Sequence, residues 1–263
     1  MQRKIPAHNN DAGQEISAGN MLGPMPPSKI GKKSLVLDLD ETLVRSQFQE
    51  PAKYDLKLPV RMENRDYQVY VAVRPGTHEF LAEMAKYYEL VIFTASLSKY
   101  ANPLMDILDP EGLCTGRLFR EHCTFEDRVY VKDMSYLGRR IEDVILIDNS
   151  PNSYRPQPEN AIPILSWYDD PTDTELFKLM PFLVGLSRVP DVRTVLGVVH
   201  KDHVMDLQLA DDMVKKLLKE EEKKRQQQSQ IQQKTSNRVS NFNSSDFDLN
   251  DRTSDAELLS IMQ

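Results

Sequence analysis

The chain has 263 residues, of which 40% are hydrophobic and 28% charged, and this composition is typical of one or two globular domains. Its formal net charge of −7 gives no electrostatic reason to bind nucleic acid broadly, and no apolar run approaches the ~20 residues that span a bilayer. Cys114 and Cys123 are too few for a disulfide scaffold or a structural zinc site, and no secretory signal is visible, so we expect a reducing compartment.

Composition divides the chain into four parts. Residues 1–33 are rich in Asn, Gly, Gln and Ser without any periodic pattern, and we predict a disordered arm there. Residues 34–197 carry the regular apolar runs of a folded domain. We expect a helical extension over 198–225, supported by i,i+4 charge pairs, and a disordered Gln/Asn/Ser-rich tail over 226–263.

The folded part begins with an apolar run, Leu35–Leu37, that predicts a buried strand. Alternating hydrophobicity between residues 48 and 73, broken at 63–66, predicts a β-hairpin inserted after that strand. Helical and strand patterns then alternate, with predicted helices after residues 76, 96, 171 and 189 and predicted strands at 90–93, 117–123, 128–131, 144–147 and 161–165.

This alternation predicts an α/β fold with a doubly wound, mainly parallel sheet. No glycine-rich phosphate loop follows any strand, which argues against a dinucleotide-binding or P-loop fold. The central strands instead end in polar groups, namely Asp38 with Asp40, Thr94 with Ser96, and Asp148 with Asn149. Because ligands bind at the carboxyl ends of parallel strands, we expect one pocket there.

Asp38 and Asp40 alternate with leucines, so both carboxylates project from one side of the strand end. Two carboxylates this close repel each other unless a cation or a shared proton lies between them. The alternative interpretation is a polar turn in which Asp, Glu and Thr only cap the next element.

The three strand ends together supply what phosphoryl transfer needs. Asp38 can attack phosphorus, and Asp40 can protonate the leaving oxygen and later accept a proton from water. Thr94 can donate a hydrogen bond to a phosphate oxygen, and Lys132 supplies positive charge. Asp38, Asp148, Asn149 and the main-chain carbonyl of Asp40 offer oxygen ligands for Mg²⁺.

The stretch Asp38–Val44 resembles the signature of the haloacid dehalogenase superfamily, and more narrowly the small-type phosphatases of the RNA polymerase II C-terminal domain. The resemblance covers about residues 33–196. Further matching stretches are Arg74-Pro75, Phe93–Ser96, Lys99-Tyr100, Arg117–Arg120, Tyr130–Asp133, Leu137–Arg139, Leu146–Ser153, Trp167 and Asp173–Leu176.

The resemblance implies an Mg²⁺-dependent phosphoserine/phosphothreonine phosphatase in the nucleus, with cytoplasmic residence as the alternative. It also implies that Arg120 contacts substrate near the phosphate. Arg45 stands where the small-type pattern usually has His, and Met62 where it usually has a β-branched residue, which leaves the peptide preference open. The implied apolar pocket for a substrate proline corresponds to Phe48, Val60, Met62, Val69, Leu97 and Tyr100.

Three functions stay open at this point. The first is a phosphatase acting on phosphoserine-proline motifs of the polymerase tail, with no direct nucleic-acid contact and no membrane span. The second is the same chemistry on another phosphoprotein, such as a regulator of lipid metabolism. The third is a non-catalytic phosphopeptide-binding scaffold, against which the presence of both Asp38 and Asp40 argues.

Overall fold

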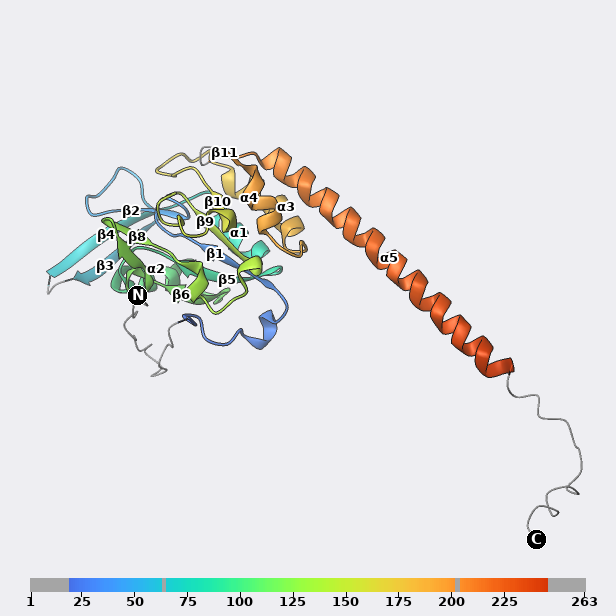
Figure 1. Ribbon diagram of the computed structural model, residues 1–263. Helices are drawn as coiled ribbons and strands as arrows, with labels where there is room; N and C mark the ends of the chain where they lie inside the picture. Colours follow the sequence, from blue (N-terminus) through green and yellow to red (C-terminus); the bar gives the residue numbers. More distant parts are fainter. Residues whose placement is uncertain (1–18, 63–64, 202–203, 246–263) are drawn as a thin grey trace, which may run out of the picture. The chain divides into compact units, whose positions relative to one another are not determined.

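The computed structural model describes residues 19–62, 65–201 and 204–245 (Figure 1). The chain divides into two compact units, Met1–Lys216 and Leu217–Gln263. The first unit contains the folded domain and every residue that the sequence predicts to be functional. In the second unit, the described residues form the C-terminal part of one helix, α5 (Leu207–Ser245).

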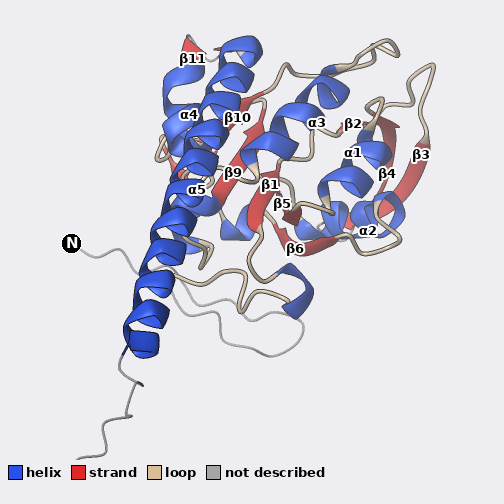
Figure 2. Ribbon diagram, turned by 90° about the vertical axis from the view of Figure 1, so that its right-hand side faces the viewer, coloured by secondary structure: helices blue, strands red, loops and turns tan. Residues whose placement is uncertain are grey.

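A five-stranded parallel sheet forms the centre of the first unit (Figure 2). Its register places Leu37 of the middle strand beside both Ile92 and Ile147, so the carboxyl ends of three strands are level. The α/β fold with a parallel sheet is therefore confirmed. In spatial order the strands are β10 (Ala161–Pro163), β9 (Val144–Asp148), β1 (Lys33–Leu37), β5 (Tyr88–Phe93) and β6 (Cys114–Leu118).

Both faces of the sheet are buried, as the continuous apolar runs of β1, β5 and β9 require. Helices α1 (Thr77–Met84) and α3 (Glu175–Leu186) pack together, and α1 contacts β5. The other face, which includes Val36, Phe93 and Leu146, packs against side chains of short 3₁₀ turns and loops such as Met134 and Tyr154.

An antiparallel sheet follows β1 directly, in the order β2 (Val44–Gln47), β4 (Arg65–Val73) and β3 (Leu56–Met62). The predicted hairpin insertion corresponds to β3 and β4, and its turn at 63–64 lies outside the described residues. Helix α2 (Ser98–Leu108) contacts β3. The insertion therefore lies beside the carboxyl ends of the central strands.

A second antiparallel hairpin, β7 (Thr124–Glu126) and β8 (Val129–Val131), precedes β9. The structure differs here from the strand predicted over 117–123, because β6 ends at Leu118 and a 3₁₀ turn occupies Arg120–His122. Of the two strands predicted at 117–123 and 128–131, the second corresponds to β8 and matches its prediction.

Residues 19–32 differ from the expected disordered arm. The Met21 amide donates a hydrogen bond to the Tyr136 carbonyl at 2.8 Å, and Met21 and Leu22 pack against the sheet. Lys29 ends the 3₁₀ turn η1 (Pro27–Lys29), and its ammonium group donates to the Ala85 carbonyl at 2.9 Å. Two apolar side chains anchor this segment, and two are too few to produce a periodic pattern in the sequence. Residues 1–18 lie outside the described part.

After α4 (Arg193–Val199), a short hairpin leads into α5. Its two strands, β11 (His200–Lys201) and β12 (Val204–Met205), have two residues each. The helix starts later than the predicted extension and continues through the Gln-rich run that was expected to be disordered. Gln and Lys are good helix formers, so the run can extend a helix without an apolar face. Residues 246–263 lie outside the described part. Within the described chain, we find no helix with the length and apolarity needed to cross a bilayer.

Candidate active site

The chain makes a tight turn immediately after β1. The Asp38 amide still bonds to the Ile147 carbonyl at 3.0 Å, and Asp38 is buried. Glu41 then adopts a left-handed conformation with φ of 58°, which is rare for a residue with a side chain. The Glu41 amide donates a hydrogen bond to the Val44 carbonyl at 2.7 Å, and the Glu41 carbonyl accepts one from the Trp167 amide at 2.8 Å. These two bonds hold the strained turn from both sides. The turn points Asp38 and Asp40 toward the rim of the sheet.

Lys132 lies between two carboxylates at the centre of the rim. Its Nζ is 2.5 Å from Asp38 Oδ1 and 2.6 Å from Asp148 Oδ2, and all three side chains are at least nine-tenths buried. Strand β8 delivers Lys132, and the Lys132 amide bonds to the Ser153 carbonyl at 2.7 Å. The structure thus brings together residues that lie more than 90 positions apart in the sequence.

The electrostatics of this cluster leave an excess of negative charge. Burial raises the pKa of Asp38 to about 7; the charges of Asp148 and Asp40 act in the same direction, and Lys132 opposes them. Burial alone would lower the pKa of Lys132, but the charges of Asp148 and Asp38 outweigh burial and raise it, so Lys132 remains an ammonium ion. One ammonium ion therefore faces two buried carboxylates, and a further cation would stabilise the ionised cluster.

Asn149 and Thr42 complete the oxygen-rich side of the site. The Thr42 hydroxyl lies 2.9 Å from Asp38 Oδ2 and 3.3 Å from Asn149 Oδ1. The Asn149 amide nitrogen donates to Ser166 Oγ at 2.9 Å, which turns Oδ1 toward Thr42 and Asp38. The donor set fits Mg²⁺, which prefers oxygen ligands.

No group of three or more His, Cys, Asp or Glu side chains in the described residues is arranged to hold a metal ion. An ion here would need the Asn149 amide and a main-chain oxygen besides the two aspartates. The magnesium site therefore stays a prediction.

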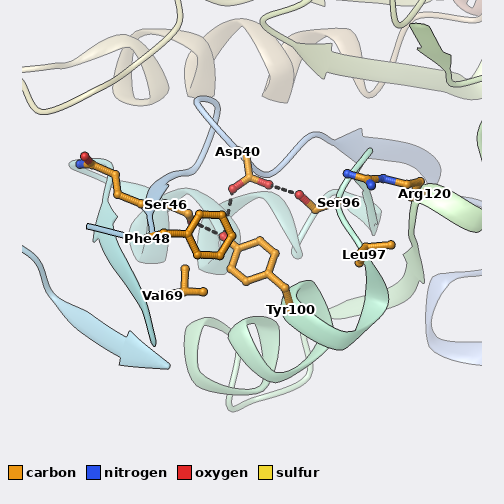
Figure 3. A pocket seen from close by; sticks show the side chains of 9 residues that line it. Asp40, Ser46, Phe48, Val69, Ser96, Leu97, Tyr100 and Arg120 are labelled. Carbon is orange, nitrogen blue, oxygen red and sulfur yellow. Dashed lines mark hydrogen bonds between the residues drawn. The ribbon is translucent and has the colours of Figure 1, made fainter. Parts of the chain in front are cut away.

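Asp40 has its own hydroxyl partners (Figure 3). Ser96 Oγ donates to Asp40 Oδ2 at 2.7 Å, and the Tyr100 hydroxyl donates to Asp40 Oδ1 at 2.9 Å. Burial and then the charge of Asp40 raise the pKa of Tyr100 far above its ordinary value, so Tyr100 stays protonated and donates. The sequence analysis placed Ser96 beside Thr94 at this strand end without giving it a role, and it assigned Tyr100 only to a substrate pocket.

Thr94 directly follows β5 and is buried, and its Oγ1 accepts a hydrogen bond from the Ser96 amide at 3.0 Å. It lines an open cavity of about 590 Å³ together with Asp38, Asp40, Lys132 and Asp148. The cavity also has members to which the sequence analysis gave no individual role, namely Glu41, Ala95, Ser96, Arg128, Val129, Tyr130, Ser150, Asn152 and Ser153.

A smaller cavity of about 240 Å³ adjoins the first and shares Asp40, Ser96 and Arg120 with it (Figure 3). Among the predicted proline-pocket residues, four line this cavity: Phe48, Val69, Leu97 and Tyr100.

The other two predicted pocket residues belong to β3, which is separated from β2 by β4. Val60 is buried but does not line this cavity. The Met62 side chain lies outside the described part of the chain.

Residues 33–193 match the family model of the NLI interacting factor-like phosphatases. The chain belongs to this family. It is 50% identical over 183 residues to the CTD small phosphatase-like protein of Homo sapiens, a match that covers 66% of each chain. It is 49% identical over 188 residues to the probable C-terminal domain small phosphatase of Dictyostelium discoideum, covering 72% of this chain and 61% of that protein.

The match to the human carboxy-terminal domain RNA polymerase II polypeptide A small phosphatase 1 has 50% identity over 165 residues and covers 63% of each chain. The chain thus spans about two thirds or less of the length of these relatives. Among solved structures, a fission yeast RNA polymerase II CTD phosphatase bound to beryllium fluoride aligns with a TM-score of 0.47 and 18% identity, covering 75% of this chain and 66% of that one.

Proposed function

We propose that this chain is an Mg²⁺-dependent protein serine/threonine phosphatase that works through an aspartyl-phosphate on Asp38. The single observation that carries the proposal is the buried bridge of Lys132 between Asp38 and Asp148, with Asp40 on the same turn. A buried lysine with two carboxylates at an open cavity is poised to bind a phosphate dianion, whose charge the ammonium group can partly neutralise.

The first half of the reaction opens the phosphoester. One carboxylate oxygen of Asp38 attacks phosphorus, and a bond forms between them as the bond to the substrate serine oxygen breaks. The carboxyl group of Asp40 gives its proton to that leaving oxygen, which departs as the serine hydroxyl. Ser96 and Tyr100 hold the Asp40 side chain through its two oxygens during this transfer.

The second half releases phosphate. Asp40, now a carboxylate, accepts a proton from a water molecule while the water oxygen attacks phosphorus. The bond between phosphorus and Asp38 breaks, which restores the Asp38 carboxylate and frees inorganic phosphate. Lys132 and Thr94 contact the phosphoryl oxygens in both halves, because both line the cavity at the Asp38 side chain.

A bound Mg²⁺ ion would neutralise charge on the carboxylates and on the phosphate. Asp38, Asp148, Asn149 and the main-chain carbonyl of Asp40 are the groups that would hold it. Thr42 and Ser166 orient Asp38 and Asn149 for this purpose.

We infer that the substrate is a phosphoserine-proline peptide, with the C-terminal domain of RNA polymerase II as the candidate and the nucleus as the compartment. The adjoining apolar cavity supports this inference, because Phe48, Val69 and Tyr100 offer a surface that suits a proline ring. The names of the relatives, which include CTD small phosphatases, point in the same direction.

The test is a phosphopeptide panel assayed with the full chain, with and without Mg²⁺. We expect phosphate release from phosphoserine-proline peptides that depends on Mg²⁺ and is lost in Asp38→Asn. Turnover that survives this substitution would reject the mechanism. Preferred turnover of unrelated phosphoproteins would reject the substrate, and tight binding without any turnover would favour a scaffold instead.

A further inference from the structure

Arg128 occupies the tip of the β7–β8 hairpin at the wall of the catalytic cavity. The strands pair Glu126 with Val129, so Asp127 and Arg128 form a two-residue turn. Their φ angles are 51° and 65°, the left-handed values of a type I′ turn. The second position of such a turn strongly favours glycine, so an arginine there costs about 1 kcal/mol or more. Such strain at a cavity wall motivates a functional explanation.

The hairpin that carries Arg128 is held in place by its other residues. Arg155 donates to Glu126 Oε2 and Asp127 Oδ2, both at 3.1 Å. The Tyr130 ring stacks against Phe125 with a centroid separation of 4.9 Å, and the Arg120 guanidinium lies 4.8 Å from the same ring centre. These contacts fix the turn, and the two hairpin acids have Arg155 as a partner.

Arg128 itself has no such neutralising contact. Within the described residues, no carboxylate lies within ion-pair distance of its guanidinium group, and the side chain is exposed at the cavity. Arg120, the other arginine of the wall, is fixed differently because its Nε donates to the Ala95 carbonyl at 2.6 Å. Arg128 therefore presents an unpaired guanidinium group, whose planar set of donors suits carboxylate or phosphate oxygens.

We propose that Arg128 is a specificity-determining residue, which binds a second anionic group on the substrate peptide, flanking the phosphoserine that is hydrolysed. This inference rests on the proposed phosphatase function. Arg128 and Lys132 flank β8 and are four residues apart, which corresponds to ~13 Å of extended chain. An extended substrate would place its second anion roughly two to four residues from the scissile phosphate. That anion is an aspartate or glutamate side chain or a second phosphate.

The test measures kcat/KM of the full chain for three matched sets of peptides. The first set has one phosphoserine with neutral flanks. The second set adds a glutamate two to four residues away on either side, and the third adds a second phosphoserine at those positions instead. We expect kcat/KM to be roughly three- to tenfold higher for an anionic flank, with phosphate above carboxylate. The preference should shrink as ionic strength rises.

Three variants of the same position separate charge from strain. Arg128→Gln and Arg128→Gly should both remove the preference and leave kcat/KM for the neutral peptide unchanged, whereas Arg128→Lys should retain part of it. Arg128→Gly should also raise Tm relative to Arg128→Gln, because glycine suits the turn. Arg61→Gln is the matched control, since it removes the same charge from an exposed strand position outside the cavity wall.

The proposal is overturned if the Arg128 variants change all peptides equally, or if they change none. Binding of the same peptides, measured by fluorescence anisotropy, provides a readout that does not need turnover. Absence of turnover in the parent chain would count against the phosphatase proposal alone. An anionic-flank preference in binding that disappears in Arg128→Gln would still support the role of Arg128, and its absence would reject that role.

Discussion

The Arg74 guanidinium group binds the Asp173 carboxylate through two hydrogen bonds, from Nε and Nη2, each 2.8 Å long. Its remaining nitrogen, Nη1, donates to the carbonyls of Thr42 and Leu165 at 3.1 and 3.2 Å. Arg74 is fully buried and joins the turn after β1 to the segment that contains Ser166 and Trp167. It thus acts on the site through Thr42, which contacts Asp38.

Arg74→Lys should impair turnover because a lysine cannot reproduce the two-pronged bond to Asp173. We expect kcat to fall about tenfold or more and the Mg²⁺ concentration for half-maximal activity to rise, as Thr42 loses its fixed position. Steady-state kinetics over a range of Mg²⁺ concentrations measure both quantities.

The matched control is Arg139→Lys. Arg139 forms an equivalent buried pair with Glu89, with bonds of 2.8 and 2.7 Å, but Glu89 lies at the opposite end of β5 from Thr94. Thermal unfolding should show a similar loss of stability in both variants. If Arg139→Lys reduced kcat as much as Arg74→Lys does, the positioning role of Arg74 would be wrong.

Tyr100→Phe removes the hydroxyl that donates to Asp40 and keeps the ring that lines the smaller cavity. We expect kcat to fall roughly ten- to a hundredfold, the worth of one hydrogen bond to a charged group, while KM for a proline-containing phosphopeptide changes little. Leu97→Ala tests the opposite case, in which KM changes more than kcat, because this substitution trims the cavity and leaves Asp40 untouched. A larger change in KM than in kcat for Tyr100→Phe would contradict the assignment.

The pKa of Asp38 predicts how stability depends on pH when Mg²⁺ is removed. Because the folded-state pKa is raised from 3.8 to about 7, the folded protein binds this proton more tightly than the unfolded chain does. The group therefore favours folding most below pH ~4, and this contribution is lost as pH rises through about 7.

Thermal unfolding of chelator-treated protein should show this trend, with Tm falling by roughly several degrees relative to Asp38→Asn over that interval. The comparison with Asp38→Asn cancels the titration of groups elsewhere in the chain. Lys132, Asp148 and Asp40 face Asp38 and are common to both proteins. Parallel Tm curves for the two proteins would show that Asp38 ionises normally.

Leu22→Ala tests whether the segment before β1 contributes to stability. Leu22 is partly buried against the sheet core, and a Cβ built on Gly116 would meet its Cδ2 at 2.7 Å. We expect a loss of about 1–2 kcal/mol in the free energy of unfolding, measured with denaturant, and unchanged kcat. Ile30→Ala is the control, because Ile30 is exposed in the same segment and should cost little. Equal stability of both variants would mean that the segment is not anchored.

The sequence predicted the central architecture because the buried strands are short apolar runs that end in polar groups. The runs before Asp38, Thr94 and Asp148 correspond to β1, β5 and β9, and the register places their ends at one rim. Lys132 is brought there by a short strand that follows a tight turn, and a lysine at a strand end has no distinguishing pattern. Its placement in the prediction depended on the chemistry required by the other groups.

Other features depended on contacts that a one-dimensional pattern does not contain. The bonds from Ser96 and Tyr100 to Asp40 depend on the pairing of β5 with β1 and on how α2 packs against β3. Val60 fits the alternation of a pocket-lining strand, yet β4 separates β3 from β2, so Val60 does not line the cavity. The Arg128 turn was missed because its left-handed conformation is unusual for this residue type.

The central claim is that Asp38 receives the phosphoryl group from the substrate. The most direct measurement is mass spectrometry of the full chain, acid-quenched during turnover of a phosphoserine-proline peptide with Mg²⁺ present and then digested. We predict one added phosphoryl group on the peptide that contains Asp38, and none in Asp38→Asn. A phosphoryl group on a different residue, or steady turnover by Asp38→Asn, would contradict this mechanism.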